Sequence, residues 1–447
     1  MLVIISDLHL TDGHTARNPH ESTFRRLGQE IRTSAEARNA RELEIVLLGD
    51  IFDVVRTDYW HRNGVPAERR PWGGEPDPVT GMNRAAAVEA QFSEILSEVL
   101  VQPGSRALIA TLQGLEAETG LRPHVTYVPG NHDRVLNNFH GLRRQIADAL
   151  DPLAVDFANV YESADYGVRA RHGHEWDDNC HGWQLFRKVL SRESDLGRFD
   201  ELAYRVMAIG EVVTAELMSG VIFHLRQALD PDKDRPFLDS LMDLHNLRPM
   251  AEAFHWLAWK KQSQYTQVSQ QAVVTALDGV LNSEFARLWN RTKRDLIVSG
   301  DLTDYLEKVR DEVRLGGLDA VRASMRLLEL IGDLRKMFVG ERTPLVDGAA
   351  EEAGALPDDS PVQYIVYGHS HRSRQDCFSA RVDGRIRMYI NTGTFLPLIE
   401  RAHDRSFYQT HRMTFACFFR DGEDTTGRAG GGPAMDMWDR MQRKVPA

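Results

Sequence analysis

The chain has 447 residues, 42% hydrophobic and 27% charged, an ordinary globular composition that excludes a disordered, collagen-like or fibrous protein. Its 54 Lys and Arg against 65 Asp and Glu give a formal net charge of −11, which argues against a large basic face for nucleic acid. The 3 widely spaced cysteines offer neither a disulfide framework nor a CxxC zinc site, and they indicate a reducing compartment.

Neither a membrane span nor a leader peptide is expected. The first apolar run, Leu2–Ile5, is too short for the core of a signal peptide. The richest apolar stretch, residues 206–225, is interrupted by Glu211 and Glu216, so we read it as a buried helix. We therefore expect a soluble, cytoplasmic protein without membrane insertion.

Short apolar runs alternate with longer amphipathic segments over the first third of the chain, as is typical of a layered α/β domain. The runs are continuous rather than alternating, which favours strands covered on both faces. In chain order, strands are expected at 2–5, 44–48, 125–128 and 167–170, and helices at 22–39, 84–100 and 105–119.

Helical spacing dominates from about residue 182 to 338, and strand texture resumes at residues 362–367, 385–390 and 412–419. We therefore predict an α/β fold in which a layered β-sheet core is flanked by helices and interrupted by a large all-helical insertion. The expected parts are a core of 1–181 and 362–420, an insertion of 182–340, a flexible loop of 341–361 and a tail of 421–447.

In the expected core, on both sides of the insertion in sequence, polar side chains follow the ends of five expected strands. In open α/β sheets this carboxyl edge is where ligands bind, and glycines there let the backbone turn sharply. The motifs, in chain order, are Asp7-x-His9, Gly49-Asp50-x-x-Asp53, Gly130-Asn131-His132-Asp133, the single His172 and Gly368-His369-x-His371.

These side chains suit a metal centre. Carboxylate, amide oxygen and imidazole without any thiolate favour divalent manganese, iron, nickel or zinc. Seven such groups exceed the needs of one ion, and a carboxylate can bridge two ions. The set therefore predicts a two-metal site, in which ions about 3.5–4 Å apart clamp a phosphoryl group.

The order of the motifs resembles that of the calcineurin-like metallophosphoesterase superfamily, over roughly residues 1–180 and 362–395. The resemblance implies a metallophosphoesterase-like βαβ sandwich and hydrolysis of a phosphate ester or anhydride with two divalent ions, manganese being the expected one. Asp133 makes the third motif similar to the branch of repair exonucleases, cyclic-nucleotide phosphodiesterases and UDP-diacylglucosamine pyrophosphatases. Val54, where protein phosphatases usually carry Arg, departs from the phosphatase branch.

The resemblance also implies roles for individual residues. His132 would assist the leaving group during in-line attack by a metal-bridging hydroxide, and Asp53 would orient His132. The implied ligands are Asp7, His9 and His371 for one ion, Asn131, His172 and His369 for the other, and Asp50 as the bridge.

Three assignments are weighed against alternatives. His174 could replace His172 as ligand, but the position at the strand end favours His172, and His174 is then a candidate substrate contact. Arg56 is another candidate substrate contact, or part of a loop packed on itself. A second Gly-Asp-x-x-Asp pattern, Gly300 to Asp304, falls inside the helical region and reads better as a capped helix start.

We expect a phosphodiesterase or pyrophosphatase acting on a nucleotide-like or other small phosphorylated substrate, with the insertion as a cap. One alternative is a metal-dependent nuclease on DNA or RNA, which basic clusters at residues 259–261 and 291–294 favour and the net charge opposes. The other is a non-catalytic scaffold, which the complete set of motifs disfavours. The sequence leaves open the oligomeric state and the partner of the insertion.

Overall fold

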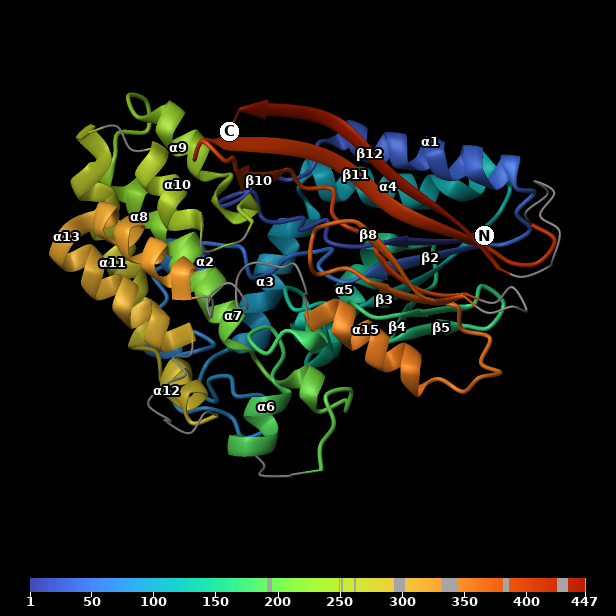
Figure 1. The fold of residues 1–447 in the computed structure, drawn as a ribbon, viewed down its shortest axis with the longest axis horizontal. Helices are drawn as coiled ribbons and strands as arrows, with labels where there is room; N and C mark the ends of the chain where they lie inside the picture. The colour runs from blue at the N-terminus through green and yellow to red at the C-terminus, as the bar shows by residue number, and fades with distance from the viewer. Residues whose placement is uncertain are drawn as a thin grey trace.

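The chain folds into two β-sheets that pack on each other and carry helices on their outer sides, which confirms the predicted α/β core flanked by helices (Figure 1). The computed structural model describes residues 1–190, 195–248, 250, 252–260, 263–292, 302–331, 344–380, 386–423 and 433–446.

The first sheet has 7 strands in the order β10-β11-β1-β2-β3-β4, with β12 paired to β11. Strands β1 to β4 are parallel, and β11 joins β1 in the antiparallel sense. The strands are β1 (Leu2–Ile5), β2 (Leu43–Leu48), β3 (Pro123–Val128), β4 (Val155–Phe157), β10 (Leu398–Arg401), β11 (Phe407–Phe419) and β12 (Ala434–Pro446).

The second sheet has 5 strands in the order β5-β6-β7-β9-β8. Strands β6 and β7 are parallel neighbours, with Ala170 opposite Val366, although the whole insertion separates them in sequence. The connection that contains the insertion therefore leaves at the carboxyl end of β6 and returns to the amino end of β7, at the other end of the strand pair. The strands are β5 (Tyr161–Ser163), β6 (Val168–Ala170), β7 (Tyr364–Tyr367), β8 (Arg374–Ala380) and β9 (Ile386–Asn391).

Alternate residues of β1 explain why its apolar run is continuous. Leu2 and Ile4 belong to the hydrophobic cluster between the two sheets, whereas Val3 and Ile5 belong to the cluster shared with the outer helices.

Helices lie on both sides of the core and throughout the insertion. They are α1 (Glu21–Ala37), α2 (Tyr59–Arg62), α3 (Val88–Leu100), α4 (Pro103–Thr119), α5 (His140–Leu150), α6 (Trp183–Leu185), α7 (Ile209–Val212), α8 (Gly220–Ala228), α9 (Arg235–Leu241), α10 (Glu252–Lys260), α11 (Thr266–Leu281), α12 (Glu284–Asn290), α13 (Leu302–Ile331) and α15 (Pro344–Ala355).

The described residues between β6 and β7 form helices and turns, most of them gathered at one end of the molecule, on the left of Figure 1. The segment Ala203–Ala228 is apolar and long enough to cross a membrane, but 89% of its most apolar window is buried inside the structure. It therefore has the burial of a core helix in a soluble protein, as its charged residues predicted.

Residues 344–355 correct the expected loop at 341–361, because they form helix α15. Leu345, Ala349 and Ala353 recur every four residues and pack on Ile365 and Tyr367, on the outer side of the second sheet. The small side chains and acids of this segment resemble a loop in composition, while their spacing places one apolar stripe on the sheet.

Residues 434–446 correct the expected tail at 421–447, because they form the long strand β12, paired with β11 from Phe419↔Ala434 to Tyr408↔Pro446. Met435 and Met437 pack on the cluster between the sheets, and Trp438 stacks on Phe415 at 5.8 Å. Charged residues between these apolar ones hide the strand pattern in the sequence.

Parts of several sequence predictions lie outside the described residues. Gly300 and Asp301 of the second Gly-Asp-x-x-Asp pattern do so, and helix α13 is described from Leu302 onwards. So do Lys261, Lys293 and Arg294 of the basic clusters, and parts of the expected insertion, loop and tail.

Candidate metal centre

The turns after the strands have an unusual backbone. A left-handed conformation costs about 1–2 kcal/mol for a residue with a side chain, and such strain concentrates at functional sites. In this chain it coincides with five of the expected ligands, whose φ angles are Asp7 52°, His9 42°, Asp50 55°, His369 64° and His371 61°.

Glycines make these turns close enough for the side chains to meet. A Cβ on Gly130 would lie 2.3 Å from Asp50 Oδ1, and a Cβ on Gly368 would lie 2.4 Å from Asp7 Oδ2. Asp133 joins the third turn to the second, because its carboxylate accepts hydrogen bonds from the backbone N–H of Gly130 at 2.5 Å and from that of Ile51 at 3.0 Å. The turns from β2 and β3 are thus held as one unit.

Asp7, His9 and His371 meet in the first group of candidate ligands, with ligand atoms within 4.8 Å of one another. The Nε2 atoms of His9 and His371 lie 2.9 Å apart, and Asp7 Oδ1 lies 3.5 Å from His371 Nε2 and 3.9 Å from His9 Nε2. Atoms that bind one ion at about 2.1 Å are separated by about 3.0–3.4 Å. The three distances bracket this range, so the group is compatible with a shared cation.

Asp50, His172 and His369 form a second such group. Asp50 joins both groups, because its Oδ2 lies 3.5 Å from His9 Nε2 and 3.3 Å from His172 Nε2. Asn131 is 5% exposed, and its Oδ1 makes no hydrogen bond to any described residue. An uncompensated buried acceptor is costly, so this oxygen also fits a cation ligand.

Hydrogen bonds on the far side of three of the imidazoles fix which nitrogen faces the centre. His172 Nδ1 donates to the Leu48 carbonyl at 2.8 Å, which leaves Nε2 as an acceptor. His369 Nε2 lies 3.3 Å from Asp177 Oδ2, which leaves its Nδ1. His9 Nδ1 lies 2.7 Å from Asp53 Oδ2, which again leaves Nε2. Such outer partners are typical of metal-binding histidines.

The electrostatics differ between the two groups of candidate ligands. Burial, together with nearby Arg56, lowers the pKa of His9 to about 3. Burial alone would lower the pKa of His172, but Asp50 raises it to about 10. Asp50 thus favours a positive charge beside His172, which either a proton or a divalent cation supplies.

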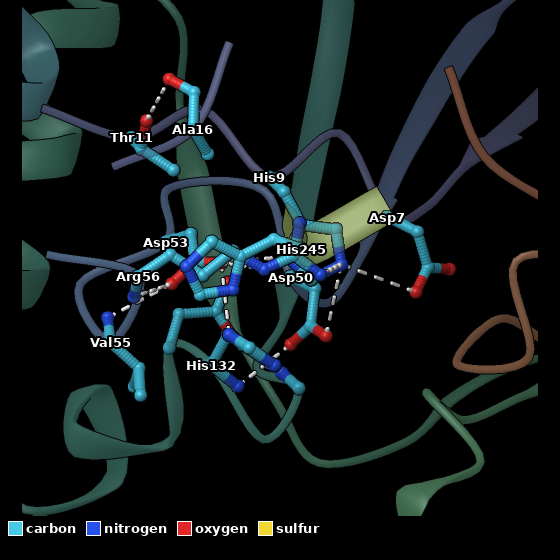
Figure 2. A network of polar contacts seen from close by, with 12 residues as sticks. Asp7, His9, Thr11, Ala16, Asp50, Asp53, Val55, Arg56, His132 and His245 are labelled. Carbon is cyan, nitrogen blue, oxygen red and sulfur yellow. Dashed lines mark hydrogen bonds and ion pairs between the residues drawn. The ribbon is translucent and has the colours of Figure 1, made fainter. Parts of the chain in front are cut away.

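Asp53 connects the first group to His132 (Figure 2). Its Oδ2 contacts His9 Nδ1 at 2.7 Å and His132 Nδ1 at 2.9 Å, and its Oδ1 accepts from the backbone of Val55 and Arg56, both at 2.9 Å. Although burial opposes ionisation, His132 and His9 hold the pKa of Asp53 well below its ordinary value. Burial lowers the pKa of His132, but Asp53 and Asp50 outweigh it and raise that pKa.

The structure places the two expected substrate contacts differently. Arg56 is 2% exposed, and its Nη2 lies 3.4 Å from His9 Nε2, beside the first group. His174 is 1% exposed, with its ring centroid 5.4 Å from that of His172, but it joins none of the metal-capable groups among the described residues. His172, not His174, therefore meets Asp50 and His369.

Sequence reasoning missed two contributors. Asp177 lies outside the motifs, five residues after His172, and contacts His369. Arg248 comes from the insertion, with its Nη2 2.8 Å from His371 Nδ1. Burial and nearby Arg56 lower the pKa of Arg248 to about 9. No local pattern marks either residue, because both reach the centre through tertiary structure.

No family model matches the chain, and a search of curated proteins found no match. The structure itself shows buried clusters of His and Asp that could bind metal ions, and these clusters are compatible with a metal-dependent hydrolase.

Proposed function

We propose that this chain is a dinuclear-metal-dependent phosphohydrolase of the calcineurin-like metallophosphoesterase type, acting in the cytoplasm as a phosphodiesterase or pyrophosphatase on a small phosphorylated, nucleotide-like substrate. One observation carries the proposal. A single carboxylate oxygen, Asp50 Oδ2, lies within 3.5 Å of His9 Nε2 and 3.3 Å of His172 Nε2, between two groups of candidate ligands. A bridging carboxylate of this kind is typical of two-metal hydrolases.

The residues divide the work as follows. Asp7, His9 and His371 would hold one ion, Asn131, His172 and His369 the other, and Asp50 both. We expect the ions to be manganese. When bound, such ions supply Lewis-acid activation of water and of the phosphoryl group.

His132 contributes the proton transfer. Because its Nδ1 lies 2.9 Å from Asp53 Oδ2, the proton it can release to a leaving oxygen sits on Nε2. Asp53 also raises the pKa of His132 against the effect of burial, which favours the protonated imidazole that a general acid needs. Asp53 is therefore a positioning residue for both His132 and His9.

The test measures metal content and hydrolysis together. Manganese-loaded protein should hold about two ions per chain and hydrolyse bis(p-nitrophenyl) phosphate, and Asp50→Asn should lose both properties. Asp304→Asn is the matched control, since Asp304 ends the second Gly-Asp-x-x-Asp pattern and is exposed on α13. Full hydrolysis by Asp50→Asn, or no bound metal in the unmodified chain, would refute the proposal.

A further inference from the structure

A segment of the insertion is fixed against the core beside the candidate metal centre. Residues 244–246 form a short 3-10 turn, and Leu247 then pairs with Ile399 of β10 in an isolated bridge. The backbone N–H of Arg248 donates to the Ile399 carbonyl at 2.9 Å. The backbone of the insertion is thus attached to the first sheet at Leu247 and Arg248.

The side chain of Arg248 is held in a defined direction. Its Nη1 donates to the carbonyls of Leu247 at 2.7 Å and His245 at 3.0 Å. Its Nη2 lies 2.8 Å from His371 Nδ1 and 3.0 Å from His371 Nε2. Two carbonyls therefore fix one end of the guanidinium and leave the other end against a candidate ligand.

Arg56 approaches the same place from the core (Figure 2). Its Nη2 lies 3.4 Å from His9 Nε2, and that atom is 2.9 Å from His371 Nε2. The side chain is 2% exposed, and its Nη1 makes no hydrogen bond to any residue that the structure describes. Two guanidinium groups, one from the core and one from the insertion, thus converge on one pair of histidines.

The charges of these two arginines are incompletely balanced. Arg56 lies 3.2 Å from Asp53, but the Oδ2 atom that it faces also contacts His9 and His132. Arg248 forms no ion pair with a carboxylate within the described part of the chain, and the two arginines repel each other. Arg56 is buried and Arg248 is partly buried, and two cations held together away from water are unfavourable unless an anion joins them.

A phosphate group fits this need, because the planar guanidinium presents paired donors that match its oxygens. A diester carries one negative charge, whereas a terminal phosphate or a diphosphate carries two or more. We propose that Arg248 and Arg56 form an anion subsite at the metal centre that selects substrates with at least two phosphate charges, such as a nucleoside diphosphate linkage or a phosphate monoester. The proposal rests on the proposed function, and it gives the insertion the role of supplying a specificity contact.

Binding of inorganic phosphate tests the subsite directly. Isothermal titration is done on protein with and without manganese, so the metal-free arm does not depend on the proposed function. Arg248→Ala should weaken phosphate binding about 10- to 100-fold, as expected for lost hydrogen bonds to a charged group, with Arg248→Lys in between. Arg235→Ala is the control, because Arg235 is an exposed arginine of the same insertion, paired with Asp232.

Activity on three substrates identifies which kind of phosphate group the subsite recognises. Arg248→Ala should lower kcat/KM on ADP-ribose and p-nitrophenyl phosphate at least 10-fold more than on bis(p-nitrophenyl) phosphate. A loss confined to ADP-ribose assigns the subsite to a diphosphate, and a loss on both doubly charged substrates assigns it to any dianionic phosphoryl group. Unchanged phosphate affinity in Arg248→Ala, or an equal loss on all three substrates, overturns the proposal. So does a fall in bound manganese, which would make Arg248 a support for His371 instead.

Discussion

Asp53 links a candidate metal ligand, His9, to the candidate general acid, His132, although it is not itself a proposed ligand. One of its oxygens contacts His9 and His132, and the other accepts two backbone N–H groups of the turn that follows it. The carboxylate is 0% exposed and cannot reorient without breaking all of these contacts. Outer-shell carboxylates of this kind fix the tautomer of a metal-binding histidine and raise its basicity.

We therefore expect Asp53→Asn to weaken manganese binding about 10- to 100-fold and to lower kcat by a larger factor, because His9 and His132 lose their orientation together. Metal titration and hydrolysis of bis(p-nitrophenyl) phosphate measure the two effects. Asp58→Asn is the matched control, since Asp58 is a buried acid of the same loop that pairs with Arg62 instead. A variant that keeps both the metal affinity and kcat would show that Asp53 serves only the fold.

At the scale of elements, the site depends on strand-end turns that carry strained ligands and close-packed glycines. Gly130 is the clearest case, because its backbone φ is not left-handed and only space decides what it tolerates. An added Cβ would lie 2.3 Å from Asp50 Oδ1 and 2.8 Å from the Asp50 backbone nitrogen. The turn after β3 would have to move away from the turn after β2.

Gly130→Ala should accordingly destabilise the chain by about 1–3 kcal/mol, as overpacking does elsewhere, and should reduce the number of manganese ions bound. Urea unfolding and metal analysis measure these outcomes. Gly354→Ala is the control, because nothing lies within 4 Å of a Cβ at that position of α15, and alanine in a helix is preferred by up to about 1 kcal/mol. Equal effects of the two substitutions would contradict the crowding argument.

The same elements show how far the sequence alone can lead. The strands that end at Ile5, Leu48 and Val128 are predictable because each is a short, largely apolar run followed by polar candidate ligands. Strand β12 is not, because its partner β11 supplies the pairing and its own charges obscure the alternation. Arg248 shows the same limit at the site, since tertiary contacts such as the bridge between Leu247 and Ile399 bring it to the centre.

At the scale of the whole molecule, the core and the insertion share their interior. One hydrophobic cluster runs from Val3 of β1 to Ile222 of α8 and Leu277 of α11. A buried ion pair crosses the same boundary: Arg134, just after the third motif, contacts Glu211 of α7 at 2.7 Å through Nε and at 3.0 Å through Nη2. The insertion therefore stabilises the turn that carries Asn131 and His132, in addition to supplying Arg248.

Glu211→Gln should destabilise the entire chain by about 3–5 kcal/mol, because it leaves the Arg134 guanidinium, 1% exposed, without its counter-charge. The matched control is Glu284→Gln on α12, where the pair with Arg287 is about half exposed and should contribute no more than about 0.5 kcal/mol.

Calorimetry of both variants also tests whether the core and the insertion unfold together. Because the core and the insertion share one cluster, Glu211→Gln should shift a single unfolding transition to lower temperature, with loss of bound manganese in the same step. Two separated transitions, of which only one moves, would mean that the insertion unfolds as an independent domain and that its contacts at the metal centre are made by docking.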